Sequence, residues 1–265
     1  MSQLVKFFLF TLGFSWLFWI PAAIWQPSET LFIPVILLGA FGPTFTGIFM
    51  TYKYGLPEER VEFWRRAWDP RRVPVLCWAV AVLFVPTTIL VSVFIGRLMG
   101  ISTPGLNEEI LFNPLMLTGF FALQLLGGPL AEELGWRGYA LDRLQGQYSA
   151  LSASLILGVV WGCWHLPLFF IEGTSQADKG FPSLLFAIWF VDIVASSVIY
   201  TWIYNHTNKS ILAAVILHLV GNACLDLLVI NAESEMAMQG LYILTGVNLA
   251  LVAAIVAIWG GKTLS

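Results

Sequence analysis

Eight apolar stretches, each close to the length needed to cross a membrane, constrain the fold of this chain more than any other feature. They cover residues 4–25, 31–52, 74–97, 112–131, 150–171, 183–204, 210–230 and 237–259. A helix needs about 20 apolar residues to span the bilayer core, where every backbone polar group must be satisfied internally. We therefore expect an all-α, polytopic bundle of about eight transmembrane helices, with residues 1–265 as a single membrane-embedded domain.

The composition excludes several classes of protein. Only 11% of the residues are charged and the mean hydropathy is +0.80, whereas an average soluble domain has about 25% charged residues. The charged side chains are too few to cover the surface of a soluble enzyme of this size. They are also too few for a disordered chain or for a protein that binds nucleic acid, so all three classes are excluded. The lipid bilayer is thus the first expected partner, and nucleic acid is not one.

Basic residues predict the orientation of the bundle. Six of them lie in the 52–73 connection: Lys53, Arg60, Arg65, Arg66, Arg71 and Arg72. Such loops usually stay in the cytoplasm, so eight spans place both termini there and leave only Arg97 and Lys179 outside. This connection also contains acidic residues, and we expect a solvated loop rather than an amphipathic segment at the lipid headgroups. Without an organelle-targeting extension, a prokaryotic plasma membrane is the expected location.

Ionisable residues inside spans are costly, so each is a candidate functional residue. The candidates are Glu132, Glu133, Arg137, His165, Asp192, His218 and Asp226, with Asn222 as a neutral companion. For each of them taken alone, a helix-end ion pair or an interhelical hydrogen bond remains an alternative. Because three separate stretches contribute, we expect these groups to meet in the cytoplasmic half. This requires the helix that carries His165 to project farther into the cytoplasm than a membrane boundary at residue 150 implies.

The fourth apolar stretch combines a helix break with acidic residues. Pro129 and the glycines before it predict a kink just ahead of Glu132 and Glu133. Glu133 and Arg137 are four residues apart and share a helix face, whereas Glu132 points about 100° away from Glu133. Two further glycines allow another helix to approach closely: Gly135 and Gly138.

These residue types together predict amide hydrolysis. Glu132 would take a proton from water, and His218 and Asn222 would donate hydrogen bonds to the oxygen of a tetrahedral intermediate. The chain has neither the His-Glu-x-x-His motif of zinc proteases nor the Gly-x-Ser-x-Gly motif of serine hydrolases. A cysteine nucleophile is not expected either, because Cys163 lies about 200° around the helix from His165. A metal ion held across helices by Glu132, His165 and His218 remains an alternative.

Three segments resemble the motifs of the CAAX protease and bacteriocin-processing family of intramembrane glutamic endopeptidases, which includes the type II CAAX prenyl endopeptidases. They are Glu132–Arg137, Trp161–His165 and His218–Asn222, in the order that the family has. The resemblance covers about residues 115–225, within a motif-bearing core of about 112–230. The second motif begins with Trp161, where the family commonly has Phe, which affects the expected substrate choice rather than the chemistry.

The resemblance implies a role for each motif residue. Glu132 would activate water with His165 beside it, Glu133 and Arg137 would support the site, and His218 and Asn222 would form the oxyanion hole. It implies an intramembrane endopeptidase with no cofactor and no metal, acting on a lipidated or membrane-associated peptide from the cytoplasmic side. The substrate and the oligomeric state stay open.

Three other functions also stay open. A zinc-dependent membrane protease would use the same residues with a metal ion. A bacteriocin-immunity or scaffold protein would bind a peptide in the same pocket without cleaving it. In a small-solute transporter, Asp192 and Asp226 would form a proton path.

Overall fold

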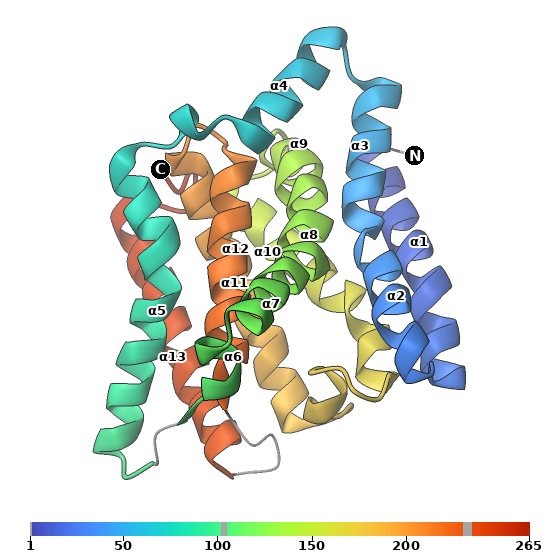
Figure 1. Cartoon of the computed structure of the whole chain (residues 1–265). Helices are drawn as coiled ribbons and strands as arrows, with labels where there is room; N and C mark the ends of the chain where they lie inside the picture. Colours follow the sequence, from blue (N-terminus) through green and yellow to red (C-terminus); the bar gives the residue numbers. More distant parts are fainter. Residues whose placement is uncertain (1, 102–104, 230–234) are drawn as a thin grey trace.

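The structure of the chain is a computed structural model that describes residues 2–101, 105–229 and 235–265. In these residues the chain forms an all-α bundle (Figure 1). The α-helices are α1 (Gln3–Trp25), α2 (Glu29–Ala40), α3 (Gly42–Tyr54), α4 (Pro57–Trp68), α5 (Val75–Leu98), α6 (Glu108–Phe112), α7 (Pro114–Gly127), α8 (Pro129–Gly135), α9 (Asp142–Gln145), α10 (Ala150–Trp164), α11 (Leu184–His206), α12 (Ile211–Asp226) and α13 (Glu235–Trp259).

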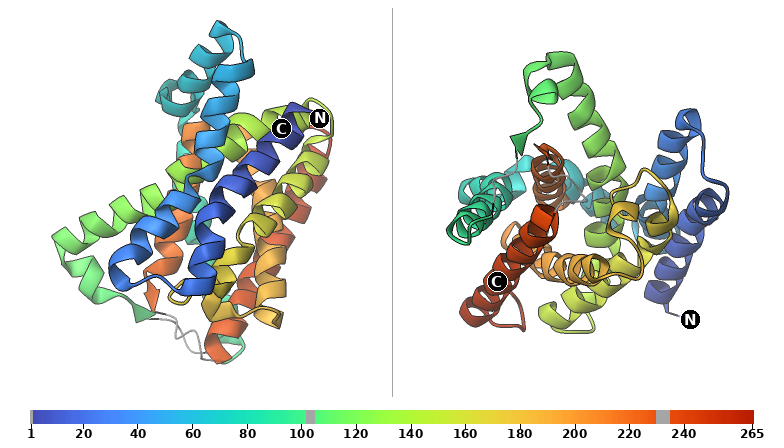
Figure 2. Two further views of the ribbon diagram at one scale, coloured as in Figure 1. Left: turned by 90° about the vertical axis from the view of Figure 1, so that its right-hand side faces the viewer. Right: turned by 90° about the horizontal axis from the view of Figure 1, so that it is seen from below.

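Short elements connect these helices. A π-helical turn, η2 (Trp136–Leu141), continues α8, and 3-10 turns are found at η1 (Pro70–Arg72), η3 (Leu166–Phe170) and η4 (Ala177–Lys179). A two-residue antiparallel ladder pairs β1 (Gly105–Leu106) with β2 (Leu228–Val229). Figure 2 shows α6 and α7 standing out from the rest of the bundle, and α7 has no buried residue.

Seven helical segments of the described chain are long and apolar enough to span a membrane, and α12 is a shorter apolar helix. These eight segments correspond to the eight apolar stretches of the sequence, so the all-α fold is confirmed. The second segment consists of α2 and α3, and the fourth of α7, α8, η2 and α9. The 16 residues of α12 extend only about 24 Å, which is less than the roughly 30 Å thickness of the hydrocarbon core.

Serine caps set the starts of the helices that carry the site. The hydroxyl groups of Ser149, Ser183 and Ser210 each accept a hydrogen bond from the backbone N–H three residues later, the usual way to satisfy the first turn of a helix. Ser149 caps α10, so this helix begins at Ala150, where the apolar stretch predicts its start. His165 follows the last residue of α10, about 22 Å along the helix from its start.

The 53–73 connection is helical, contrary to the expectation of a solvated loop. Its α4 is amphipathic, and it buries Phe63, Arg66 and Ala67. The Arg66 guanidinium forms an ion pair with Asp142 and donates hydrogen bonds to the Tyr204 hydroxyl at 2.6 Å and the Gly138 carbonyl at 2.9 Å. The apolar face and this arginine therefore hold α4 against the bundle.

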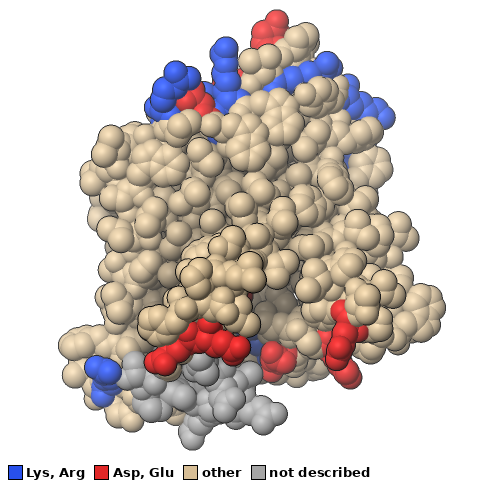
Figure 3. All heavy atoms as spheres, in the orientation of Figure 1, with Lys and Arg blue, Asp and Glu red and all other residues tan. Residues whose placement is uncertain are grey.

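Charged side chains gather at the two ends of the molecule, with an uncharged band between them (Figure 3). Most Lys and Arg side chains lie at the end that carries α4, and both chain termini lie toward this end (Figures 1 and 3). We call it the basic end. Acidic side chains predominate at the opposite end, which carries α6 and the 171–183 segment and which we call the acidic end. An apolar band between two charged ends is the surface expected of a membrane-spanning bundle.

Candidate active site

The site begins at a break between α7 and α8. α7 ends at Gly127, Gly128 has φ −133° and ψ −82°, and Pro129 starts α8. The predicted kink before the paired glutamates is therefore confirmed. It turns the chain so that α8, in which Ala131, Glu132 and Glu133 are buried, enters the interior of the bundle.

Two glycines let neighbouring elements approach this segment closely, as predicted. A Cβ atom added to Gly135 would lie 2.2 Å from the carbonyl oxygen of Pro43 in α3. A Cβ atom added to Gly138 would lie 2.9 Å from side-chain atoms of Phe63 and Ile211. The small residues thus permit α3 to pack closely on α8, and α4 and α12 to pack closely on η2.

Glu133 links two other predicted site residues. Its Oε1 accepts hydrogen bonds from Arg137 Nη1 at 3.0 Å and from His218 Nδ1 at 2.8 Å. The side chains of Glu133 and Arg137 are 0% exposed. The Arg137 guanidinium also lies 4.6 Å from the ring centre of Trp161 and 4.3 Å from that of Tyr200, so two aromatic faces stabilise the buried cation. The predicted Glu133–Arg137 pair is confirmed.

Trp161 connects Glu132 to His165. Its indole Nε1 donates a hydrogen bond to Glu132 Oε2 at 2.5 Å, and its carbonyl oxygen lies 2.8 Å from His165 Nδ1. A carbonyl oxygen can only accept, so Nδ1 carries the proton and Nε2 of a neutral His165 ring is left as an acceptor. The rings of Trp164 and Trp189 contact His165 edge-on and fix its orientation.

His218 and Asn222 converge beside the helix break. A Cβ atom added to Gly128 would lie 2.8 Å from Asn222 Nδ2 and 3.3 Å from His218 Nε2. The absence of a side chain at Gly128 therefore lets both nitrogens approach the backbone just before Glu132. Because the Nδ1–H of His218 already donates to Glu133, Nε2 is the ring atom left for another partner.

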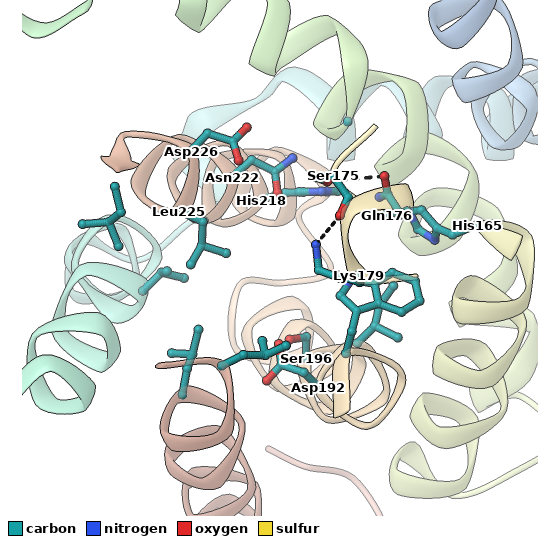
Figure 4. Close-up of a pocket in the computed structure, with 18 of the residues that line it drawn as sticks. His165, Ser175, Gln176, Lys179, Asp192, Ser196, His218, Asn222, Leu225 and Asp226 are labelled. Atoms are coloured by element: carbon teal, nitrogen blue, oxygen red, sulfur yellow. Dashed lines mark hydrogen bonds between the residues drawn. The ribbon is translucent and has the colours of Figure 1, made fainter. Parts of the chain in front are cut away.

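One cavity of about 860 Å³ receives four of the six predicted site residues: Glu132, His165, His218 and Asn222. Figure 4 shows His165, His218 and Asn222 around this space. Glu133 and Arg137 do not line it and lie buried behind its wall. Most of the lining side chains are apolar and come from α2, α5, α10, α11, α12 and α13, as is usual for ligand sites that have a few convergent polar groups.

The cavity also contains charged residues to which the sequence analysis gave no role in hydrolysis. Asp192 accepts a hydrogen bond from Asn248 Nδ2 at 2.9 Å, and Asp226 accepts one from the Gln124 amide. Lys179 enters from η4 and was overlooked, because a lone lysine in a polar connection looks like any solvated residue. The indole donor of Trp161 was also missed, although the residue itself opens the second motif.

The described residues contain no group of three or more His, Cys, Asp or Glu side chains arranged to hold a metal ion. The set considered for a metal, Glu132, His165 and His218, lines one cavity without forming such a cluster. Their hydrogen bonds go instead to Trp161 and Glu133.

Two comparisons with known proteins cover the segment that carries this site. The family model "Type II CAAX prenyl endopeptidase Rce1-like" matches residues 114–224, which include all three motifs and the helix break. A protein of Methanococcus maripaludis, CAAX prenyl protease 2, is 29% identical over 251 residues, covering 92% of both chains. The chain is therefore similar to the Rce1-like type II CAAX prenyl endopeptidases over the segment that carries all three motifs.

Proposed function

We propose that this protein hydrolyses a peptide bond in a lipidated or membrane-associated peptide, with Glu132 as the general base. The observation that carries the proposal is the convergence of Glu132, His218 and Asn222 on one largely apolar cavity. A carboxylate can activate water there, and the two nitrogens can stabilise an oxyanion.

The reaction would begin with a water molecule held between the Glu132 carboxylate and Nε2 of His165. Glu132 takes one proton of this water as the oxygen attacks the carbonyl carbon of the scissile bond. The negative charge that develops on the carbonyl oxygen is stabilised by hydrogen bonds from Asn222 Nδ2 and from Nε2–H of the doubly protonated His218 ring. The C–N bond then breaks, and Glu132 passes its proton to the leaving amine.

In this scheme Glu133 and Arg137 act through His218. The Glu133 carboxylate orients the imidazole through Nδ1 and stabilises its positive charge. Arg137 holds the carboxylate from the other side. Both are positioning residues, because neither lines the cavity.

The apolar cavity wall supports a lipid-modified substrate. The cavity is lined mainly by aliphatic and aromatic side chains, and the relative from Methanococcus maripaludis is named as a prenyl protease. A prenyl or acyl chain beside the scissile bond would bury its apolar surface against this wall. Activity on the lipidated peptide should therefore exceed activity on the same peptide without lipid.

The test is cleavage by purified protein in lipid vesicles, with products identified by mass spectrometry. The parent should cleave a member of a lipidated peptide library, and Glu132→Ala and Glu132→Gln should not. Cleavage by both variants at the rate of the parent would overturn the mechanism.

The alternative functions predict other results. A chelator should leave activity unchanged, whereas loss of activity together with stoichiometric zinc would favour the zinc protease. If the protein is instead a bacteriocin-immunity or scaffold protein, the Glu132→Gln variant should retain its function in cells.

We further propose that the basic end faces the cytoplasm of a prokaryotic cell, because loops rich in Lys and Arg stay on that side. The cavity lies toward the other end, since it is lined by residues of the 173–179 segment and by Asp226 at the end of α12. Substrates would then enter from the extracytoplasmic side. This differs from the expected cytoplasmic site, which requires α10 to project into the cytoplasm.

Labelling of single cysteines from one side of the membrane tests this orientation. In a variant in which Cys77, Cys163 and Cys224 are replaced by Ala, the reporter Ser175→Cys lies at an exposed position of the 171–183 segment. The reporter Glu58→Cys lies at an exposed position of α4. An impermeant maleimide should label the first reporter in intact cells and the second only after permeabilisation. The reverse pattern would place the cavity opening in the cytoplasm.

A further inference from the structure

Lys179 is the only Lys or Arg among the described residues that line the cavity. It belongs to η4, in the connection between α10 and α11. Figure 4 shows its ammonium group projecting into the space between α12, which carries His218 and Asn222, and α11, which carries Asp192. A cation is thus placed in the same cavity as the predicted oxyanion donors.

The ammonium group of Lys179 has hydrogen-bonding capacity to spare. It donates to the Ser175 carbonyl at 2.6 Å, but an ammonium has three N–H donors. Among the described residues, no carboxylate oxygen lies within the 4.0 Å that defines an ion pair with it. Its position is therefore that of a cation without a close anionic partner in a mainly apolar space.

The electrostatic surroundings of Lys179 are consistent with this position. Burial lowers the pKa of the Lys179 ammonium, and the charges of Asp178 and Asp226 offset only part of this effect. A buried ammonium is stabilised when an anion pairs with it. A ligand that brings a carboxylate to Lys179 would supply that missing partner.

We propose that Lys179 forms a subsite that binds a carboxylate of the peptide substrate, either the free C-terminal carboxylate or the side chain of an acidic residue. This inference rests on the proposed peptidase function. It adds a specificity determinant to it, because a carboxylate anchored at Lys179 sets which peptide bond reaches Glu132. The cleavage position would then be counted from the anchored carboxylate.

The test compares three lipidated peptides of one sequence: a C-terminal acid, a C-terminal amide, and an amide with a glutamate near its end. Parent protein should have a KM about tenfold lower for the acid than for the amide, which corresponds to one charge-assisted hydrogen bond. The third peptide identifies the source of the carboxylate, since a low KM shows that an acidic side chain can replace the chain terminus.

Variants at position 179 then assign the preference. Lys179→Met should bring the KM ratio of amide to acid close to one, and Lys179→Arg should restore the preference. Asp178→Asn should strengthen it, because one competing carboxylate is removed. Equal KM values for acid and amide in the parent, or an unchanged ratio in Lys179→Met, would overturn the subsite while leaving the peptidase function intact.

Binding of the same peptides to Glu132→Gln separates this inference from the proposed function. Fluorescence anisotropy measures the affinity of labelled acid and amide peptides without any turnover. The acid should bind about tenfold more tightly, and Lys179→Met in the same background should abolish the difference. If the parent cleaves no peptide but this difference is found, the peptidase function fails and the carboxylate subsite stands. Equal affinities would contradict the subsite whatever the activity.

Discussion

The indole Nε1 of Trp161 donates a hydrogen bond to Glu132 Oε2 at 2.5 Å, while the carbonyl group of the same residue accepts one from His165. One residue on α10 therefore holds both the proposed base and the histidine beside it. The Trp161 ring also stacks on Arg137. The first residue of the second motif therefore contacts both Glu132 and Arg137 of the first motif.

Replacing Trp161 by Phe should separate these contributions. Trp161→Phe keeps an aromatic ring on Arg137 but removes the donor to Glu132. We expect kcat to fall about tenfold, with little change in KM, because one hydrogen bond to a charged group is lost. This replaces the expectation that the residue at position 161 affects only the choice of substrate, since its indole contacts Glu132. Steady-state kinetics with the lipidated peptide measure this effect, and a thermal unfolding curve checks the fold. An unchanged kcat would mean that this hydrogen bond does not position the carboxylate for catalysis.

Gly128 and Gly127 form a matched pair for testing the proposed oxyanion hole. Gly128→Ala places a methyl group 2.8 Å from Asn222 Nδ2 and 3.3 Å from His218 Nε2, whereas a Cβ atom at Gly127 would meet only Leu37, at 3.5 Å. We expect kcat to fall about 100-fold for Gly128→Ala, which is the effect of losing an oxyanion donor, and much less for Gly127→Ala. Similar rates for the two variants would argue against a transition-state role for these nitrogens.

The buried ion pair should be visible in stability. Glu133→Gln leaves Arg137 as a buried cation without its carboxylate, and we expect the free energy of unfolding to fall by about 3 kcal/mol. The exposed Glu58→Gln is the control. Adding Arg137→Met to Glu133→Gln should cost less than the sum of the single changes, because the two side chains interact directly. Additive losses in denaturant titrations would contradict the coupling.

A second stability test concerns the basic end. Arg66 and Arg65 are adjacent on α4, but Arg66 is buried against Asp142, Tyr204 and Gly138, whereas Arg65 is exposed. Arg66→Met should lower the free energy of unfolding by about 3 kcal/mol, since Asp142 loses a buried partner. Arg65→Met should change it by less than about 0.5 kcal/mol. Equal effects in denaturant titrations would show that α4 is not anchored through Arg66.

Much of the fold was predictable, because the length of an apolar stretch determines whether a helix spans the bilayer. The break at Pro129, the Glu133–Arg137 pair and the close approach at Gly135 followed from local rules. The helical state of the 53–73 connection could not be predicted from such local rules. Its burial depends on contacts made by Arg66 to residues more than 70 positions away along the chain.

The site was only partly predictable. The motif residues could be named, but not the hydrogen bond from Trp161 to Glu132 or the position of Lys179, because both depend on how α8, α10 and η4 are arranged in space. The start of α10 at Ala150 was predictable from the apolar stretch, whereas the depth of His165 in the membrane depends on how α10 is placed in the bilayer.

The most direct test of the central claim compares substrate binding and turnover in Glu132→Gln. This variant retains the size of the side chain and an oxygen that can accept the Trp161 hydrogen bond, but it cannot take a proton from water. In one vesicle preparation, peptide affinity should stay within about threefold of the parent, while kcat falls at least about 1,000-fold. A variant that binds normally and cleaves within about tenfold of the parent would contradict the role of Glu132 as the base.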